Sequence, residues 1–337
     1  MAVNVAAWAA AKGSLLESKP ATLWTPANDQ ILVKNSAIAV NPIDVMCQTT
    51  DFFDLKYPSI FGHDVAGEVV AIGPGVSGFR KGDRVIGHAA GFHSQKNEEG
   101  GFQAYTILRT NMASKIPQSI SFERAVVLPL GMSTAAAGLF QSDLLGLELP
   151  TIPARKPLGK TLLVWGGASS VGSCVVQLAV AAGYEVITTA SPKNFEYVKK
   201  LGASEVYDYN QPSVISELAK ALNGKDFVGI FDTIGGQAWG SVIDISQKVQ
   251  GSNIVATVLP GFPEQPSVDM KYTYSFGILD SPVSKALYED FLPAALEAGT
   301  VVPAPDPLIV GTSLGDAQKA MDVRAKGVSA QKIVLKF

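Results

Sequence analysis

The stretch Val164-Trp-Gly-Gly-Ala-Ser-Ser-Val-Gly172 decides the fold of this chain. A buried strand is predicted just before it, at 161–165, and an apolar helix just after it, at 171–182. Small residues at such a turn let the backbone approach a pyrophosphate, whose negative charge is met by N–H groups at the start of the helix. The turn therefore predicts a dinucleotide-binding site, with a purely structural tight turn as the alternative.

The spacing of this turn departs from G-x-G-x-x-G, because Ser169 stands at the position of the second glycine. Gly172 is expected to let the helix pack closely against the strand. The residues expected to contact the cofactor at this turn are Gly166, Gly167, Ala168, Ser169, Ser170, Val171 and Gly172.

Strands and helical stretches alternate on the C-terminal side of the turn. Further strands are predicted at 184–189, 205–208, 227–232 and 253–258. Apolar strands that alternate with helices are typical of a parallel sheet covered on both faces. The sequence therefore predicts a doubly wound α/β domain, which we assign to residues 126–270.

The N-terminal part of the chain has a different pattern. Residues 1–125 contain short apolar runs, such as 31–40, between turns rich in Gly and Pro, which predicts a mostly β, barrel-like domain. After residue 270, a helical pattern at 284–298 precedes a final strand at 332–337. We expect 271–337 to complete the β-rich domain.

The composition excludes several classes of function. A length of 337 residues suggests two domains, and 27 Lys and Arg against 30 Asp and Glu leave no basic excess for nucleic acid. The N-terminus lacks a basic leader, and the longest apolar run is shorter than the ~20 residues of a bilayer span, so no membrane association is expected. Two cysteines, Cys47 and Cys174, form no disulfide framework or zinc motif, which indicates a reducing, cytoplasmic location.

The end of the second strand indicates which dinucleotide binds. A site for NAD carries an acid there, about 20 residues beyond the glycine turn, which accepts from the ribose 2′-hydroxyl. This chain has Ser191, Lys193 and Asn194 instead, and a hydroxyl, an ammonium and an amide suit a 2′-phosphate. Tyr209, after the third strand, adds a phenol near the adenosine. We therefore expect NADPH, although Lys193 is also open to interpretation as a solvated residue at the start of a helix.

Five motifs, taken in chain order, carry a resemblance to a known family: Asn41-Pro-Ile-Asp44, Phe61-Gly-His-Asp-Val-Ala-Gly-Glu68, Phe79-Arg-Lys-Gly-Asp-Arg-Val85, Leu130-Gly-Met-Ser-Thr-Ala-Ala136 and the 166–172 turn. Over its whole length the chain resembles the medium-chain dehydrogenase/reductase superfamily, and within it the zinc-free quinone oxidoreductases and fungal trans-acting enoyl reductases of the CipB-like type. The resemblance implies a GroES-like catalytic domain at 1–125 and 271–337 and a Rossmann NADP-binding domain at 126–270. It also implies a homodimer or a monomer.

The resemblance also implies residue roles. Asn41 and Thr134 would border the nicotinamide as positioning residues of the catalytic site. Other residues expected beside the nicotinamide are Val258, Leu259, Val328 and Ser329. Many enoyl reductases of this type carry a lysine two residues after the aspartate of the N-P-x-D motif, where this chain has Met46. The role of that lysine is not carried over, and no proton donor is assigned.

The residues at the zinc-ligand positions of the superfamily indicate that this chain uses no zinc. Zinc-dependent members have a cysteine in place of Asn41, a His-Glu pair in place of His63-Asp64, and a third ligand in place of Leu130. A catalytic zinc needs three protein ligands, and only His63 is a good one. The lobe expected to hold a structural zinc, at 91–101, contains no cysteine.

Without a metal, the charge that develops on oxygen during reduction must be met by hydrogen-bond donors or water. This favours transfer of a hydride to an activated C=C bond, whose charge is delocalised, in a small-molecule enone or enal or in a carrier-bound polyketide. An NADPH quinone reductase is the first alternative. The second, from another class, is a non-catalytic NADPH-binding redox sensor or structural protein.

Overall fold

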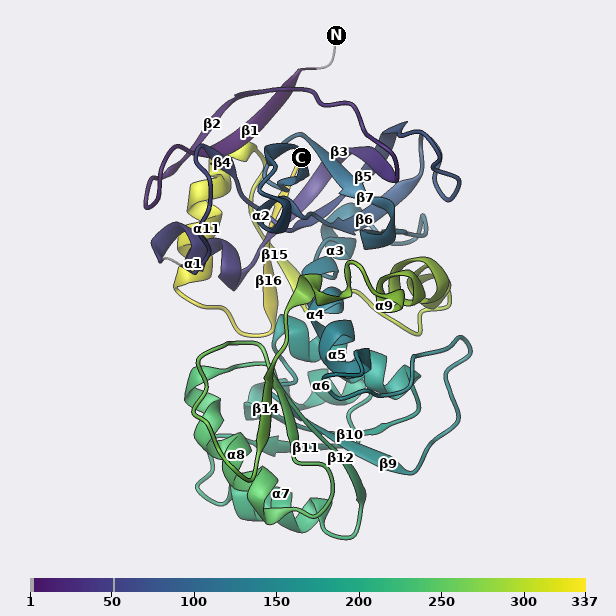
Figure 1. Ribbon diagram of the computed structural model, residues 1–337, viewed down its shortest axis with the longest axis vertical. Coiled ribbons are helices and arrows are strands. Elements are labelled where there is room, and N and C mark those ends of the chain that lie inside the picture. Colours follow the sequence, from purple (N-terminus) through teal and green to yellow (C-terminus); the bar gives the residue numbers. More distant parts are fainter. Residues whose placement is uncertain (1–2, 51) are drawn as a thin grey trace. The chain divides into compact units, whose positions relative to one another are not determined.

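The computed structural model describes residues 3–50 and 52–337. The chain divides into two compact units, drawn in Figure 1. The first unit comprises Met1–Leu130, Tyr288–Glu297 and Pro303–Phe337, and the second unit comprises Gly131–Leu287 and Ala298–Val302. The division into domains at residues 126 and 271 stays a prediction.

A six-stranded sheet of described residues forms the centre of the second unit, in the order β11-β10-β9-β12-β13-β14. Every pairing in it is parallel, which confirms the predicted doubly wound sheet. Its strands are β9 (Lys160–Trp165), β10 (Glu185–Ala190), β11 (Glu205–Asp208), β12 (Asp226–Asp232), β13 (Ile254–Thr257) and β14 (Asp269–Tyr272).

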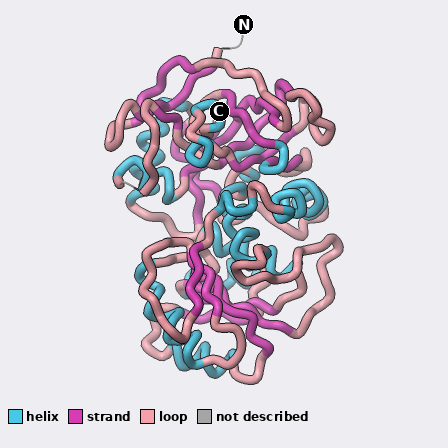
Figure 2. Tube along the Cα trace, in the orientation of Figure 1, coloured by secondary structure: helices cyan, strands magenta, loops and turns pink. Residues whose placement is uncertain are grey.

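Helices cover both faces of this sheet, as Figures 1 and 2 show, with α5 and α6 on one side and α7 and α8 on the other. The helices lying wholly or mostly in this unit are α4 (Pro129–Phe140), α5 (Ser170–Ala181), α6 (Phe195–Lys200), α7 (Val214–Leu222), α8 (Trp239–Lys248) and α9 (Pro282–Lys285). Leu218 of α7 and Val242 of α8 pack in one buried apolar cluster with Ile230 of β12. Gly183 ends α5 with a positive φ of 88°, as the sequence predicts.

The sixth strand, β14, is absent from the sequence-based prediction, which contains five strands. Its residues, Asp-Met-Lys-Tyr, include two charges and show no buried apolar run. β14 lies at the edge of the sheet and pairs only with β13 among the described strands, so one side of it needs no apolar neighbours. A strand of this kind carries little signal in the sequence.

The first unit is rich in β structure, as predicted. Six strands form a sheet in the order β15-β16-β3-β5-β6-β8, to which β7 adds by pairing with β3, and a smaller sheet has the order β2-β1-β4. The strands are β1 (Asn4–Ala9), β2 (Leu16–Ala21), β3 (Gln30–Val40), β4 (Ser59–Ile60), β5 (Asp64–Ile72), β6 (Arg84–His88), β7 (Tyr105–Arg109), β8 (Ala113–Lys115), β15 (Asp306–Gly311) and β16 (Gln331–Lys336). The α-helices are α1 (Pro42–Thr49), α2 (Gly91–Ser94), α3 (Phe122–Ala125), α10 (Leu292–Glu297) and α11 (Ala317–Ala325).

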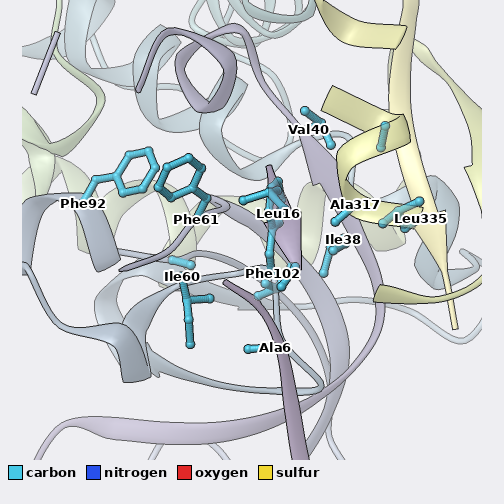
Figure 3. Close-up of a cluster of buried hydrophobic side chains, with 14 of the residues drawn as sticks. Ala6, Leu16, Ile38, Val40, Ile60, Phe61, Phe92, Phe102, Ala317 and Leu335 are labelled. Atoms are coloured by element: carbon cyan, nitrogen blue, oxygen red, sulfur yellow. The ribbon is translucent and has the colours of Figure 1, made fainter. Parts of the chain in front are cut away.

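The core of the first unit lies between these sheets and helices, and Figure 3 shows part of it. Phe61, Phe92 and Phe102 are buried there, and the rings of Phe61 and Phe92 meet edge to face at 5.1 Å. The helix predicted at 284–298 is present as three consecutive stretches, with a π-helical segment, Ala286–Phe291, between α9 and α10.

The register of the large sheet brings residues that are distant in sequence to the same end of neighbouring strands. Ile333 of β16 pairs with Val40 of β3, so Lys332 comes opposite Asn41, which directly follows β3. On the other side of β3, Ala39 pairs with Asp64. Asp64 in turn pairs with His88 at the end of β6. Four polar residues far apart in the sequence therefore meet at this end of the strands.

Candidate functional site

The glycine turn of the second unit is packed so tightly that its glycines have no room for a side chain. Gly166 has φ of 87°, a conformation that favours glycine. A Cβ on Gly172 would collide with the backbone of Gly166 and Gly167, and one on Gly167 would collide with the Thr188 side chain. This close approach of α5 to β9 is the role predicted for Gly172.

Ser169, which departs from the glycine pattern, is the N-cap residue of α5. Its hydroxyl oxygen accepts from the Gly172 N–H at 2.9 Å and its O–H donates to Thr233 Oγ1 at 2.9 Å. Thr189 Oγ1 accepts from the Gly166 N–H at 3.0 Å. The sequence analysis missed both threonines, although each stands at the carboxyl end of a predicted strand, where ligands of parallel sheets bind.

The residues predicted to bind a 2′-phosphate lie at that same edge. Ser191 directly follows β10 and Tyr209 directly follows β11, and the register pairs Ala190 with Asp208 just before them. Asn194 Nδ2 donates to Ser191 Oγ at 3.1 Å. Lys193 is exposed, as is Tyr209, at 45%. The structure thus brings a hydroxyl, an amide, an ammonium and a phenol to neighbouring strand ends.

The acid at this edge, Asp208, is engaged within its own turn. Its carboxylate accepts from the Asn210 N–H at 3.0 Å and from Asn210 Nδ2 at 2.9 Å. These hydrogen bonds, the backbone one first, lower the pKa of Asp208. The negative charge of Asp208 is therefore stabilised by hydrogen bonds within its own turn. Asp208 ends the third strand, whereas the acid of an NAD site ends the second.

A second polar group lies at the ends of β12 and β13. The buried Asp232 carboxylate accepts from the Gly235 N–H at 3.1 Å and from Thr257 Oγ1 at 2.8 Å, and burial raises its pKa against the effect of these bonds. The Val258 N–H donates to the Asp232 carbonyl at 3.2 Å. The Leu259 side chain lies against Gly235, where a Cβ would meet it. Val258 and Leu259, two of the residues predicted beside the nicotinamide, are thereby held at the carboxyl ends of the strands.

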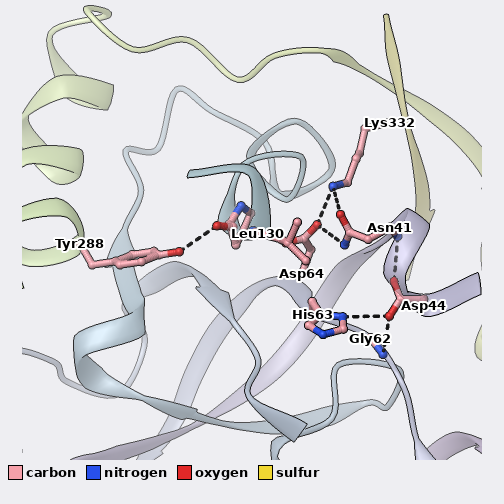
Figure 4. Close-up of polar contacts among 9 residues, drawn as sticks. Asn41, Asp44, Gly62, His63, Asp64, Leu130, Tyr288 and Lys332 are labelled. Atoms are coloured by element: carbon pink, nitrogen blue, oxygen red, sulfur yellow. Dashed lines mark hydrogen bonds and ion pairs between the residues drawn. The ribbon is translucent and has the colours of Figure 1, made fainter. Parts of the chain in front are cut away.

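The first unit contains a buried cluster of Asn41, Asp64 and Lys332, shown in Figure 4. Lys332 Nζ is 2.8 Å from Asp64 Oδ2 and donates to Asn41 Oδ1 at 2.6 Å. Asn41 Nδ2 donates to the same Asp64 Oδ2 at 2.8 Å, so the three side chains form a closed triangle. We call these three residues the lysine triad. The sequence analysis singled out Asn41 but missed Lys332.

Backbone groups hold Asp64 from its other side. Asp64 Oδ1 accepts from the Leu130 N–H at 2.6 Å, at the start of α4. The buried Tyr288 O–H donates to the Pro129 carbonyl at 2.9 Å and so ties the same turn of α4 to the unit (Figure 4). Both carboxylate oxygens of Asp64 are therefore occupied by hydrogen-bond donors.

Asp44 organises the residues below the lysine triad. Its Oδ2 accepts from the Asn41 N–H at 2.8 Å, and its Oδ1 lies 2.9 Å from His63 Nδ1. The His63 ring lies 5.7 Å from that of His88. Burial above all, and then the charges of His63 and Lys332, hold the pKa of His88 well below its ordinary value of 6.5. His88 is therefore neutral in the folded protein.

This donor set does not fit zinc. Asn41 offers an amide, Leu130 offers no side-chain ligand, and Asp64 is bound on both oxygens. Among residues 3–50 and 52–337, no group of three or more His, Cys, Asp or Glu side chains can hold a metal ion. Cys47 is buried in α1, and burial, with the Asp44 carboxylate, raises the pKa of its thiol, which disfavours the thiolate that binds metals.

The remaining predicted residues are divided between the units. Thr134 is nearly buried on α4 in the second unit, whereas Asn41 belongs to the first. Val328 and Ser329 precede β16 in the first unit, where Val328 packs partly against the core. Their shared role around a nicotinamide stays a prediction.

Comparison with known proteins identifies the family. Residues 27–118 match the family described as "Alcohol dehydrogenase GroES-like domain", and residues 170–275 match "Zinc-binding dehydrogenase". The zinc-binding alcohol dehydrogenase domain-containing protein cipB of Emericella nidulans is 47% identical over 333 residues, which are 98% of this chain and 98% of cipB. The chain belongs to the medium-chain dehydrogenase/reductase superfamily.

Other members of the superfamily agree with this assignment. The trans-enoyl reductase himH of Aspergillus japonicus is 38% identical over 99% of this chain and 98% of its own. The structure of an alcohol dehydrogenase superfamily protein from Novosphingobium aromaticivorans aligns with a TM-score of 0.81 at 24% identity, over 99% of each chain, and shares the fold. The resemblance predicted from the motifs, including the CipB-like type, and the predicted fold class are confirmed. Of the helices in the described residues, none has the length and apolar character of a membrane span.

Proposed function

We propose that this chain is an NADPH-dependent reductase that delivers hydride, without zinc, to the activated C=C bond of an enone, an enal or a polyketide enoyl group. The observation that carries the proposal is the lysine triad. Two of its members, Asn41 and Asp64, stand where the resemblance places metal ligands in zinc-dependent members, and both are already bound to each other and to Lys332. In zinc-dependent members a Lewis acid stabilises the alkoxide that develops during alcohol oxidation. Conjugate reduction spreads its charge over an enolate, which an amide, a hydroxyl or water can meet.

The cofactor part of the proposal rests on the second unit. The 166–172 turn and the start of α5 would bind the pyrophosphate, since residues 168–171 of the turn are partly exposed and the N-terminus of a helix attracts anions. Ser191, Lys193, Asn194 and Tyr209 would surround the 2′-phosphate at the ends of β10 and β11. We assign the NADP-binding role to residues 126–270 and the catalytic role to 1–125 with 271–337.

When bound, NADPH supplies the hydride. The chain's own residues would bind and orient the acceptor and exclude water from it. Asn41 and Thr134 would position the nicotinamide, with Val258, Leu259, Val328 and Ser329 packed around it. The acceptor is a small molecule, free or attached to a carrier. Two buried cysteines, Cys47 and Cys174, support a cytoplasmic location.

The proposal is tested by a screen of acceptors with NADPH. Cyclohexenone, menadione and a saturated aldehyde are offered in turn, and ethanol is offered with NADP⁺. We expect cyclohexenone to be reduced to cyclohexanone faster than menadione is reduced. Formation of the allylic alcohol, or rapid oxidation of ethanol, would overturn the reaction type, and faster turnover of menadione would favour a quinone reductase. Binding of NADPH without turnover of any acceptor would favour a redox sensor or structural protein.

A further inference from the structure

The ammonium group of Lys332 is buried, which is unusual for lysine. The residue is 3% exposed, and it belongs to β16, the last described strand along the chain. Burial of a charge is strongly unfavourable unless a partner of opposite charge lies close by. Asp64 provides that partner at 2.8 Å and is itself fully buried. The buried Asp64 carboxylate therefore needs a cation beside it, and the buried Lys332 ammonium needs an anion.

The contacts of Lys332 coincide with the positions at which zinc-dependent relatives bind their metal. Its Nζ contacts Asn41 and Asp64, and Asp64 is bound in turn by the backbone of Leu130. These three residues occupy three of the four positions that the resemblance names, and the fourth, His63, contacts Asp44. The chain matches a family described as zinc-binding, but the Asp64 carboxylate at this site is already neutralised by the Lys332 side chain.

We propose that the Lys332 ammonium is the resident cation of this site and takes over the charge balance that a metal supplies elsewhere. It neutralises Asp64 and fixes the orientation of the Asn41 amide. If that amide were flipped, its NH₂ group would face the ammonium, and its oxygen would face the Asp64 carboxylate. Lys332 is therefore a positioning residue that acts through Asn41. Many enoyl reductases that this chain resembles carry a lysine in α1, where this chain has Met46. The lysine of the triad comes from β16.

This inference rests on the proposed function for its kinetic part only. The requirement for a cation beside Asp64 is a property of the folded chain and is measurable without any acceptor. We therefore choose an experiment in which the cation is removed and then supplied again as a small molecule. Lys332→Ala leaves a space for a primary ammonium ion, and methylammonium and ethylammonium are the probes. Tetramethylammonium, which cannot donate a hydrogen bond, is the control at equal ionic strength.

A matched variant controls for the loss of a lysine on the same strand. Lys336 of β16 pairs with Glu123 at 2.9 Å, but its side chain is 49% exposed. Lys336→Ala should keep the unfolding midpoint and the turnover of the wild type, with no response to amines. Lys332→Arg keeps the charge, and Lys332→Met keeps the length of the side chain without the charge. The two variants separate charge from packing should Lys332→Ala fail to fold.

We expect Lys332→Ala to have a lowered unfolding midpoint and a kcat for cyclohexenone reduced roughly ten- to a hundredfold, because a shift of about 1 Å in a positioning group can cost that much. Its Kd for NADPH should change much less than kcat, because the glycine turn and the residues proposed to bind the 2′-phosphate belong to the second unit. Methylammonium should restore part of both the midpoint and kcat, and tetramethylammonium should restore neither. Lys332→Arg should retain more kcat than Lys332→Met.

Three results would overturn the inference: equal rescue by both classes of ammonium ion, a wild-type midpoint in Lys332→Met, or stoichiometric zinc in the purified wild type by elemental analysis. If the wild type reduces no enone, the proposed function fails on its own. The rescue of the unfolding midpoint by amines then still decides whether an ammonium belongs beside Asp64.

Discussion

The glycine turn of the second unit and the lysine triad of the first unit are both polar sites in apolar surroundings, but they are built from different parts of the chain. The turn uses backbone groups of residues that are contiguous, from Gly166 to Gly172. The triad uses three side chains, and its hydrogen bonds join residues 23 and 291 positions apart. One site depends on the absence of side chains and the other on their charge.

This difference predicts which substitutions each site tolerates. A backbone site tolerates changes of polar side chains but not an added Cβ, because the space is already filled. A buried ionic site tolerates small changes of shape but not the loss of one charge, because the remaining charge stays buried. Each prediction below tests one side of this comparison.

The largest effect is expected in the triad. Lys332→Met and Asp64→Asn should each lower the free energy of unfolding by about 3–5 kcal/mol, because each leaves an uncompensated buried charge. The double variant should lose less than the sum of the two, since neither charge remains. Unfolding in urea measures all three. Additive losses would show that the two charges do not interact, and the comparison would fail.

Adding a methyl group to a glycine of the turn is expected to lower both the stability of the protein and its affinity for NADPH. Gly172→Ala forces a Cβ into the backbone of Gly166 and Gly167, and overpacking of this kind costs about 1–3 kcal/mol. It should lower NADPH affinity as well, because the turn must open. Gly240→Ala is the control, since Gly240 lies inside α8 with open space around it and should gain up to about 1 kcal/mol. NADPH binding unchanged in Gly172→Ala would mean that the turn is not the phosphate site.

We expect selectivity for the 2′-phosphate to depend on side chains that follow β10 and β11, beside the glycine turn. Lys193→Ala should weaken NADPH binding by about 1–3 kcal/mol, the range of hydrogen bonds to charged groups, and leave NADH binding nearly unchanged. Lys199→Ala is the matched control, because Lys199 lies on the following helix and pairs with Glu196. Titration of nucleotide fluorescence measures both cofactors. Equal losses for NADPH and NADH, or none, would remove Lys193 from the site.

The smallest effect is a pH dependence in the first unit. His88 has a pKa well below 6.5 when folded, whereas in the unfolded chain it titrates near 6.5. Below pH 6.5 the unfolded state therefore binds more protons, and His88 should lower stability by up to about 1.4 kcal/mol per pH unit as the pH falls. His88→Gln should flatten this slope in thermal unfolding between pH 6.5 and 5. His93→Gln, at an exposed position, removes only the smallest of the charge effects on His88 and should keep most of the slope, and identical slopes in both variants would contradict the account.

The glycine turn could be predicted from the sequence, whereas the lysine triad could not. The turn, its flanking strand and helix, and the ends of β10 and β11 were predictable because each signal is contiguous or lies at a fixed spacing from the turn. The predicted helix begins one residue late, because Ser169 rather than Ser170 provides the cap. Residue pairing across a sheet has no such local signal.

Lys332 illustrates the limit. In the run Lys-Ile-Val-Leu-Lys, the two lysines flank three apolar residues and, four positions apart, point to the same face of the strand, yet Lys332 is buried and Lys336 is exposed. Only the register of β16 against β3, and of β3 against β5, brings Lys332 to Asp64. Asp232 and Thr257 were missed for the same reason, since they meet through the pairing of β12 with β13.

The central claim, hydride transfer from NADPH to an activated C=C bond, is tested most directly by isotopic labelling. NADPH carrying deuterium at both hydrogen positions of nicotinamide C4 is incubated with the chain and cyclohexenone, and the product is examined by mass spectrometry and NMR. The account predicts cyclohexanone with deuterium at the former β-carbon and none at the carbonyl carbon. Deuterium on the carbinol carbon of an allylic alcohol, or no deuterium in any product, would contradict it.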